Sequence, residues 1–374
     1  MLAASRSRMR ATRGLYAACA GLVLSATFAL AGGTPEGQYA VSYVDQAGYQ
    51  YIHSNTVSDP LYTHNGHNKG WGGAQHDPCR NSILNKFQAY GWNASLHEFT
   101  FWLIFNGQNV IAEKVGTSQP SKIYILGAHY DSADNPGADD DASGVAALLE
   151  IAGIIADWDS ACTIRLCAFD KEELGLLGSA AYADDVADQD IAGMIALDMI
   201  AYRDGSGNTA RIYGRTTSNP VKLPLAQALS DYAGITATIG GQLDASDHAS
   251  FEAVGKPACC LIEYNYEGNP HYHTSTDSCD TANYLDYSYA VQLTKGALGW
   301  LVDAAGIQPP YQLGDMNCDF AFDFRDINPF VLALSSPAAY VTTYPDCDIM
   351  NGDINGDGVV DFGDINPFIA LLTR

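Results

Sequence analysis

Residues 123–173 read IYILGAHYDSADNPGADDDASGVAALLEIAGIIADWDSACTIRLCAFDKEE, and their hydrophobic pattern indicates the class of fold. Two short apolar runs, at 123–128 and 164–169, flank a segment at 142–156 whose apolar residues recur with the spacing of a helix. Two further apolar runs continue the alternation, at 194–197 and 258–262. Short buried strands that alternate with helices are typical of a parallel sheet. The sequence therefore predicts an α/β fold with a mostly parallel, mixed sheet sandwiched by helices.

The chain before this pattern divides into two parts. Residues 1–31 place four arginines ahead of an apolar run that ends in Ala29-Leu30-Ala31, a small-x-small sequence of the kind that signal peptidases cut. We expect a signal peptide and export from the cytoplasm, so that the protein is secreted, periplasmic or on the cell surface. The following residues, to about 101, are polar and rich in turn formers, which predicts an irregular N-terminal cap.

The charge of the chain excludes some classes of partner. The formal net charge is −24, and loss of the four arginines of the signal peptide would bring it to −28. Proteins that bind nucleic acids or anionic membranes need clusters of Lys and Arg, which this chain lacks. We therefore expect no nucleic acid partner and, after signal cleavage, no membrane.

The cysteines point to an oxidising compartment. Cleavage would remove Cys19 and leave eight cysteines, an even set that makes disulfides plausible in an exported protein. The alternative is that some of them are buried free thiols.

The C-terminal part of the chain is a repeat. The α/β pattern stops near residue 307, and Pro309 and Pro310 mark a linker. Residues 314–334 and 352–372 then align without gaps. We expect a main domain over 32–303, a linker over 304–313 and a duplicated module over 314–374.

Polar side chains follow each predicted strand, and parallel strands place such residues at one edge of the sheet. The side chains are imidazoles and carboxylates, and they are listed in chain order: His129, Asp140, Glu172, Glu173, Asp198, His271 and His273. Imidazole and carboxylate without thiolate form the ligand set of a catalytic zinc or cobalt centre, and there are more of them than one ion needs.

The order of these motifs resembles metallopeptidase family 28, of the bacterial leucyl-aminopeptidase type. The resemblance covers about residues 85–303. The matching segments are His129-Tyr130-Asp131, GADDDASG from Gly137, EELGLLGS from Glu172, Leu197-Asp198, Ser246-Asp247-His248 and HTSTD from His273.

The resemblance implies two zinc ions bridged by Asp140. His129 and Asp198 would complete one zinc site, and Glu173 and His273 the other. Two divalent ions against three carboxylates leave a net charge of +1, which favours hydroxide as the nucleophile.

The same resemblance implies roles around the ions. Glu172 would be the general base and Asp131 would orient His129, whereas His271, Asp139 and Asp141 have no ligand role. The predicted activity is hydrolysis of N-terminal residues from peptides.

One part of the family pattern is missing. The loop before Ser246 has Leu243 where the family has a tyrosine for oxyanion stabilisation, and Ala245 where it has a cysteine. Tyr264 or Tyr266 could substitute for that tyrosine, or could be packing aromatics.

The repeat carries the spacing of calcium loops. Positions 1, 3, 5, 9 and 12 are Asp353, Asn355, Asp357, Asp361 and Asp364 in the second repeat, and Asp315, Asn317, Asp319, Asp323 and Asp326 in the first. Position 6 is Gly358 in the second loop but Phe320 in the first, so we expect weaker or distorted calcium binding in the first loop.

Paired loops of this kind resemble dockerins. The resemblance implies attachment to a cohesin-like or cell-surface partner. We also expect Cys318 and Cys347 to join the two halves of the module. The alternative is a calcium-stabilised folding module without a partner.

Two other functions compete with the peptidase. One is a glutaminyl-cyclase-like acyltransferase, which would share the fold but use a single zinc. The other is a non-catalytic binding protein displayed through the repeat.

Overall fold

The computed structural model describes residues 32–54, 73, 75–101, 105–310, 313–345 and 347–372. The predicted signal peptide lies outside the described residues. Within them, every helix is too short or too polar to cross a membrane.

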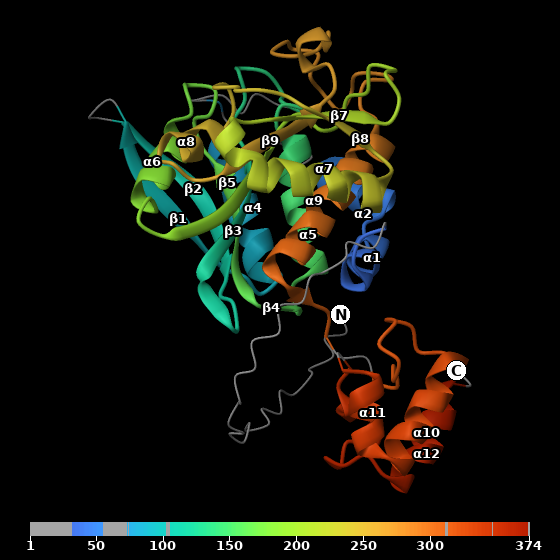
Figure 1. Cartoon of the computed structure of the whole chain (residues 1–374). Helices are drawn as coiled ribbons and strands as arrows, with labels where there is room; N and C mark the ends of the chain where they lie inside the picture. Colours follow the sequence, from blue (N-terminus) through green and yellow to red (C-terminus); the bar gives the residue numbers. More distant parts are fainter. Residues whose placement is uncertain are drawn as a thin grey trace. The chain divides into compact units, whose positions relative to one another are not determined.

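An eight-stranded mixed sheet forms the centre of the main domain (Figure 1). Its strands, in spatial order, are β1 (Asn93–Phe101), β2 (Phe105–Lys114), β5 (Cys162–Phe169), β3 (Gln119–His129), β6 (Asp190–Leu197), β9 (Ala258–Glu263), β7 (Thr209–Tyr213) and β8 (Thr236–Ile239). The four predicted strands are β3, β5, β6 and β9, and they run parallel side by side. These strands are buried on both faces, which is why they read as continuous apolar runs.

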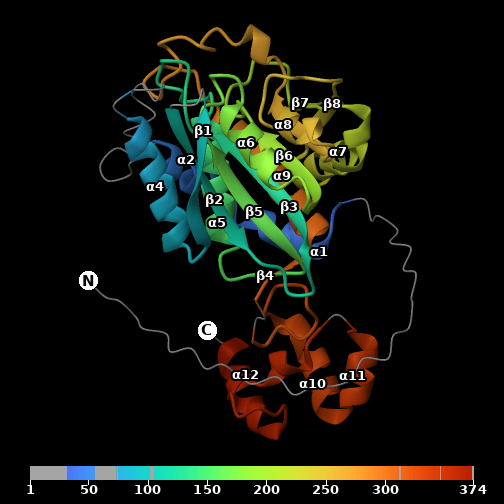
Figure 2. The same cartoon turned by 90° about the vertical axis from the view of Figure 1, so that its left-hand side faces the viewer.

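Helices cover both faces of this sheet (Figure 2), as the sequence predicts. One face packs against α1 (Pro35–Ser42), α2 (Gln46–Ser54), α4 (His76–Ala89), α5 (Ala142–Ile154), α7 (Asn219–Ala233) and α9 (Tyr287–Ala305). The other face packs against α6 (Leu177–Asp185) and α8 (His248–Ala253). A short two-stranded sheet pairs β4 (Asp159–Ser160) with β10 (Ile307–Gln308).

The prediction of an irregular N-terminal cap is wrong for much of that segment. Helices α1, α2 and α4 and strand β1 all lie before residue 102, and Tyr49, Ile83 and Phe87 from these helices are fully buried. Strand β1 pairs antiparallel with β2 at the edge of the sheet. Local sequence did not reveal these elements because polar and apolar residues are mixed along them, and packing on the large sheet stabilises them.

Glu150 gives a test of this packing that is independent of the site. It lies on α5, buried, and burial together with the nearby Asp45 carboxylate raises its pKa to about 7. The folded chain therefore binds this proton more tightly than the unfolded chain does. Titration of Glu150 therefore leaves the free energy of unfolding unchanged below about pH 4.5 and lowers it as the pH rises toward 7.

We expect Glu150→Gln to stabilise the protein by about 1–2 kcal/mol at pH 8, and by much less at pH 5, after allowance for solvent screening. The free energy of unfolding in urea at the two pH values measures this difference. Glu267→Gln, at an exposed position, is the matched control. An equal effect of Glu150→Gln at both pH values would contradict the assignment.

The C-terminal repeat folds around its own small core. Its helices and turns are η3 (Phe324–Asp326), α10 (Ile327–Ser335), α11 (Pro337–Thr343), η4 (Ile349–Gly352), η5 (Phe362–Asp364) and α12 (Ile365–Leu372). Phe330 and Phe368, at equivalent positions of the two repeats, stack with ring centroids 4.1 Å apart. Tyr340 is fully buried beside them in the same apolar cluster.

The cysteines divide between the two expected states. Cys318 and Cys347 form a disulfide within the C-terminal repeat. Cys162, Cys167, Cys259 and Cys260 are buried thiols on β5 and β9. The described structure therefore contains both a disulfide and buried free thiols, the two states expected from the sequence.

Candidate metal centre

The carboxyl ends of β5, β3, β6 and β9 meet at one edge of the sheet, and the predicted side chains lie there. His129 ends β3, Asp198 follows β6, and Glu172 and Glu173 follow β5. Asp140 lies in the loop that enters α5, and His273 lies in the loop after β9. Because neighbouring parallel strands end at the same edge, residues as far apart in the chain as Asp140 and His273 come into contact.

Asp140 lies between two imidazoles. Its Oδ1 is 3.0 Å from His129 Nε2, and its Oδ2 is 3.2 Å from His273 Nε2. The same nitrogen of His273 is 3.0 Å from Glu173 Oε2. The two oxygens of one carboxylate thus face two different groups, as a carboxylate that bridges two ions requires.

Glu172 and Asp198 complete the cluster. Potential ligand atoms of His129, Glu172 and Asp198 lie within 4.8 Å of one another, and so do those of His129, Asp140 and Glu173. All six predicted residues are therefore brought together. Glu172 lies beside His129 and Asp198, which is where a base must lie to reach a water held between them.

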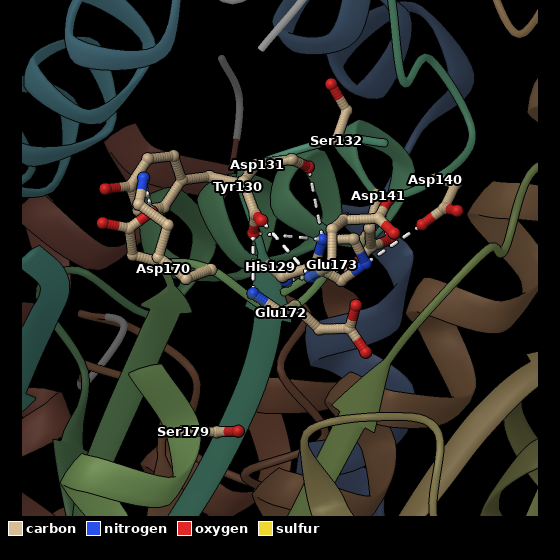
Figure 3. A network of polar contacts seen from close by, with 12 residues as sticks. His129, Tyr130, Asp131, Ser132, Asp140, Asp141, Asp170, Glu172, Glu173 and Ser179 are labelled. Atoms are coloured by element: carbon tan, nitrogen blue, oxygen red, sulfur yellow. Dashed lines mark hydrogen bonds and ion pairs between the residues drawn. The ribbon is translucent and has the colours of Figure 1, made fainter. Parts of the chain in front are cut away.

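Asp131 lies next to His129 and the two glutamates, as Figure 3 shows. Its Oδ1 is 3.6 Å from His129 Nδ1, so the contact that was expected to orient His129 is a long one. The same carboxylate accepts hydrogen bonds from the backbone N–H groups of Glu172 and Glu173, at 3.1 and 3.3 Å. Asp131 therefore positions the turn that carries the two glutamates as well as the histidine.

Asp139, Asp141 and His271, which have no predicted ligand role, form hydrogen bonds to other groups. Asp141 caps α5 by accepting the N–H of Gly144, and it also accepts the N–H of His129. Asp139 accepts the N–H of Ala201. His271 is hydrogen-bonded to Thr276 at 2.8 Å and does not line the cavity.

The electrostatics of the cluster favour a cation. Burial and the Asp140 charge raise the pKa of Glu173 to about 7, and burial raises the pKa of Asp198 to about 6. Burial would lower the pKa of His129, but the carboxylates of Glu172, Asp131 and Asp140 outweigh it and raise that pKa. Carboxylates crowded in a buried site repel each other, and divalent cations relieve that repulsion.

The donor set also fits zinc. It consists of imidazole nitrogens and carboxylate oxygens, and Glu173 Oε1 is buried without a hydrogen-bond partner. A buried carboxylate oxygen of this kind needs a hydrogen bond or a cation, and an ion at this position would supply the missing contact.

A cavity of about 300 Å³ opens over the cluster. Besides the acidic residues, Met199, Leu243, Ile262, Tyr266 and Tyr272 line it. Leu243 therefore stands in the site, at the position where the family pattern has a tyrosine. Tyr264 is not in the lining, and Arg211 lies 4.9 Å from the centre of its ring.

Tyr272 is the residue that sequence reasoning missed. Its ring stacks on His273 with centroids 4.0 Å apart. Burial raises the pKa of its phenol, and the carboxylates of Asp140 and Asp198 raise it further, so the hydroxyl stays protonated and can donate a hydrogen bond. Its position next to the predicted ligand His273 was the signal that could have identified it.

The fold and this cluster together define a class, the α/β metallopeptidases that carry imidazole and carboxylate groups at the carboxyl edge of a sheet. The sequence pattern of peptidase family M28 matches residues 109–298, just over half of the chain. The chain belongs to peptidase family M28.

Individual relatives agree with this assignment. The chain is 30% identical to leucine aminopeptidase 1 of Ajellomyces dermatitidis over 227 residues, covering 53% of this chain and 56% of that protein. The chain spans about half the length of several curated relatives that it matches.

Solved structures share the fold. The LapA aminopeptidase of Legionella pneumophila is similar with a TM-score of 0.63 and 22% identity, over 72% of this chain and 74% of that one. The glutaminyl cyclase of Porphyromonas gingivalis is similar with a TM-score of 0.54 and 21% identity, over 73% of this chain and 99% of that one. The fold is thus common to both enzyme classes considered from the sequence.

Proposed function

We propose that this protein is an exported aminopeptidase that holds two zinc ions and hydrolyses N-terminal residues from peptides. One observation carries the proposal: Asp140 directs its two carboxylate oxygens to two imidazoles, at 3.0 and 3.2 Å, beside Glu172 and Glu173. That arrangement suits a pair of ions better than a single one.

His129, Asp140 and Asp198 would hold one ion, and Asp140, Glu173 and His273 the other. Zinc supplies Lewis acidity, so that a carbonyl oxygen is polarised and a neighbouring water becomes more acidic. Asp131 holds His129 and the turn that carries Glu172 in position, because it contacts both.

Glu172 is the proposed general base. It accepts the proton of the attacking water at its carboxylate and returns it to the nitrogen of the leaving peptide. Burial raises the pKa of Glu172, so its carboxyl group holds a proton more tightly than an exposed glutamate does. A site of this kind suits a group that must both take and return a proton.

The cavity indicates the substrate. Its volume of about 300 Å³ is at the small end for ligand sites, which suits one terminal residue rather than a long peptide segment. Leu243, Ile262 and Met199 make its lining partly apolar, which favours an apolar side chain at the cleaved end.

The experiment is hydrolysis of leucine p-nitroanilide by the purified protein with zinc present. We expect turnover of this substrate and none of its N-acetylated form, because an aminopeptidase needs a free amino group. Cyclisation of N-terminal glutamine without turnover of the anilide would favour the glutaminyl-cyclase alternative, and neither activity would favour a binding protein.

Tyr272 is the proposed donor to the substrate carbonyl in place of the tyrosine that Leu243 replaces. We expect Tyr272→Phe to lower kcat by about 10²-fold while KM stays within a few-fold, because a transition-state hydrogen bond is lost. Tyr266→Phe is the matched control, since its hydroxyl approaches the exposed Glu267 at 3.4 Å. A larger loss of kcat in Tyr266→Phe would reverse the assignment.

The C-terminal repeat is proposed as a separate calcium-binding module of the dockerin type, over residues 314–374. Asp364 Oδ1 accepts the N–H of Asn355, and Asp353 accepts the N–H of Gly358, so these carboxylates point into the second loop. The proposed partner is a cohesin-like or cell-surface protein, which agrees with the expected export.

A further inference from the structure

The two proposed calcium loops have the same residue types at the ligand positions, but the residues between those positions differ. Three positions decide the difference: position 4 is Cys318 or Gly356, position 6 is Phe320 or Gly358, and position 11 is Arg325 or Gly363. Positions 4 and 6 have positive φ in both loops, between 53° and 91°. The backbone path is therefore shared, and the side chains distinguish the loops.

Arg325 forms ion pairs with two of the proposed calcium ligands of its own loop. Its Nη1 is 2.8 Å from Asp319 Oδ2, at position 5, and its Nη2 is 2.8 Å from Asp323 Oδ2, at position 9. Its Nε also donates to Asp323, at 3.0 Å. The guanidinium thus joins two carboxylates that a calcium ion would need.

The second loop has no counterpart of this contact. Its position 11 is Gly363, whose N–H donates to Asp361 Oδ1 at 2.6 Å. Its position 5, Asp357, accepts a hydrogen bond from the Asn355 amide, a neutral group. The first loop makes the same two neutral contacts, from the Asn317 amide to Asp319 and from the Arg325 N–H to Asp323, and it adds a permanent cation.

Other ties hold the first loop in place. The Cys318–Cys347 disulfide joins it to the segment before the second repeat. Asn351 donates its side-chain N–H to the carbonyl of Asp315 at 2.8 Å, and Tyr340 donates its hydroxyl to the carbonyl of Met316 at 3.0 Å. None of these contacts involves a metal ion. In the second loop, positions 4 to 6 are Gly356, Asp357 and Gly358.

We propose that Arg325 acts as an internal cation of the first loop, so that the second loop carries the calcium dependence of the module. This rests on the proposed calcium function of the repeat. A single exposed ion pair is weak, but this guanidinium bridges two carboxylates and is tethered at a high effective concentration. Calcium must displace it, which we expect to weaken binding at the first loop by about tenfold or more.

The test is calorimetric titration of the full chain with calcium, after chelation and reloading with zinc. We expect the wild-type protein to bind one calcium ion tightly and a second at least about tenfold more weakly. Arg325→Gln should tighten the weak site by at least about threefold and leave the tight site unchanged.

The outcomes separate this inference from the calcium function. Two equally tight sites in the wild-type protein, or a weak site that Arg325→Gln leaves unchanged, would overturn the role of Arg325 while the calcium function stands. No calcium binding in any variant would overturn both. Because Arg325 is 64% exposed, its replacement is not expected to prevent folding, and circular dichroism of the variant checks this.

Discussion

Replacing Glu172 with Gln is expected to lower kcat for leucine p-nitroanilide by about 10²–10⁴-fold, because the amide cannot accept the proton of the attacking water. Glu172 lies within the cluster of His129 and Asp198, and glutamine keeps the size and shape of its side chain. The variant should therefore fold and bind metal like the parent protein.

Zinc content separates Glu172 from its neighbour. We expect Glu172→Gln to retain the zinc of the parent protein, whereas Glu173→Gln, at the position 3.0 Å from His273, should lose part of it. Unchanged hydrolysis in Glu172→Gln would refute the proposed mechanism even if the protein is a peptidase. Loss of zinc in Glu172→Gln would show that this residue is a ligand instead.

Asp140→Asn is expected to abolish activity, with a fall on the order of 10³-fold or more, because both proposed ions lose the same bridging ligand. The substitution keeps the shape of the side chain and removes its charge. Each imidazole, His129 and His273, would then face an amide in place of a carboxylate. Atomic absorption of the purified variant should show that little zinc remains.

Two histidines of one loop provide the control. His273→Gln should lose the ion that His273 shares with Glu173, whereas His271→Gln should keep both ions and normal turnover, because His271 pairs with Thr276. Equal zinc contents in these two variants would mean that His273 is not a ligand.

The sequence predicted the central part of the fold because those strands are buried on both faces. The runs that became β3, β5, β6 and β9 contain almost only apolar residues, so their pattern does not depend on context. Strand β1 and helices α1, α2 and α4 were missed because they are half-exposed. Their apolar residues are stabilised by packing on a sheet whose other strands lie far along the chain.

The site was predictable for a related reason. Each of its side chains follows a strand or enters a helix, and the parallel order of β5, β3, β6 and β9 fixes where those positions meet. Tyr272 was missed because its place depends on how a loop without regular pairing turns back over the cavity. The hydrogen bonds from the backbone N–H groups of Glu172 and Glu173 to Asp131 could not be predicted either, because side-chain identity does not specify backbone contacts.

X-ray diffraction at the zinc absorption edge, from crystals of the zinc-loaded protein, tests whether two ions are bound. We expect two anomalous peaks, one among His129, Asp140 and Asp198 and one among Asp140, Glu173 and His273. The peaks should lie roughly 3.5–4 Å apart, the separation typical of two-metal hydrolytic sites. A single peak would contradict the two-ion centre, and a map without any peak at these residues would contradict the metal site itself.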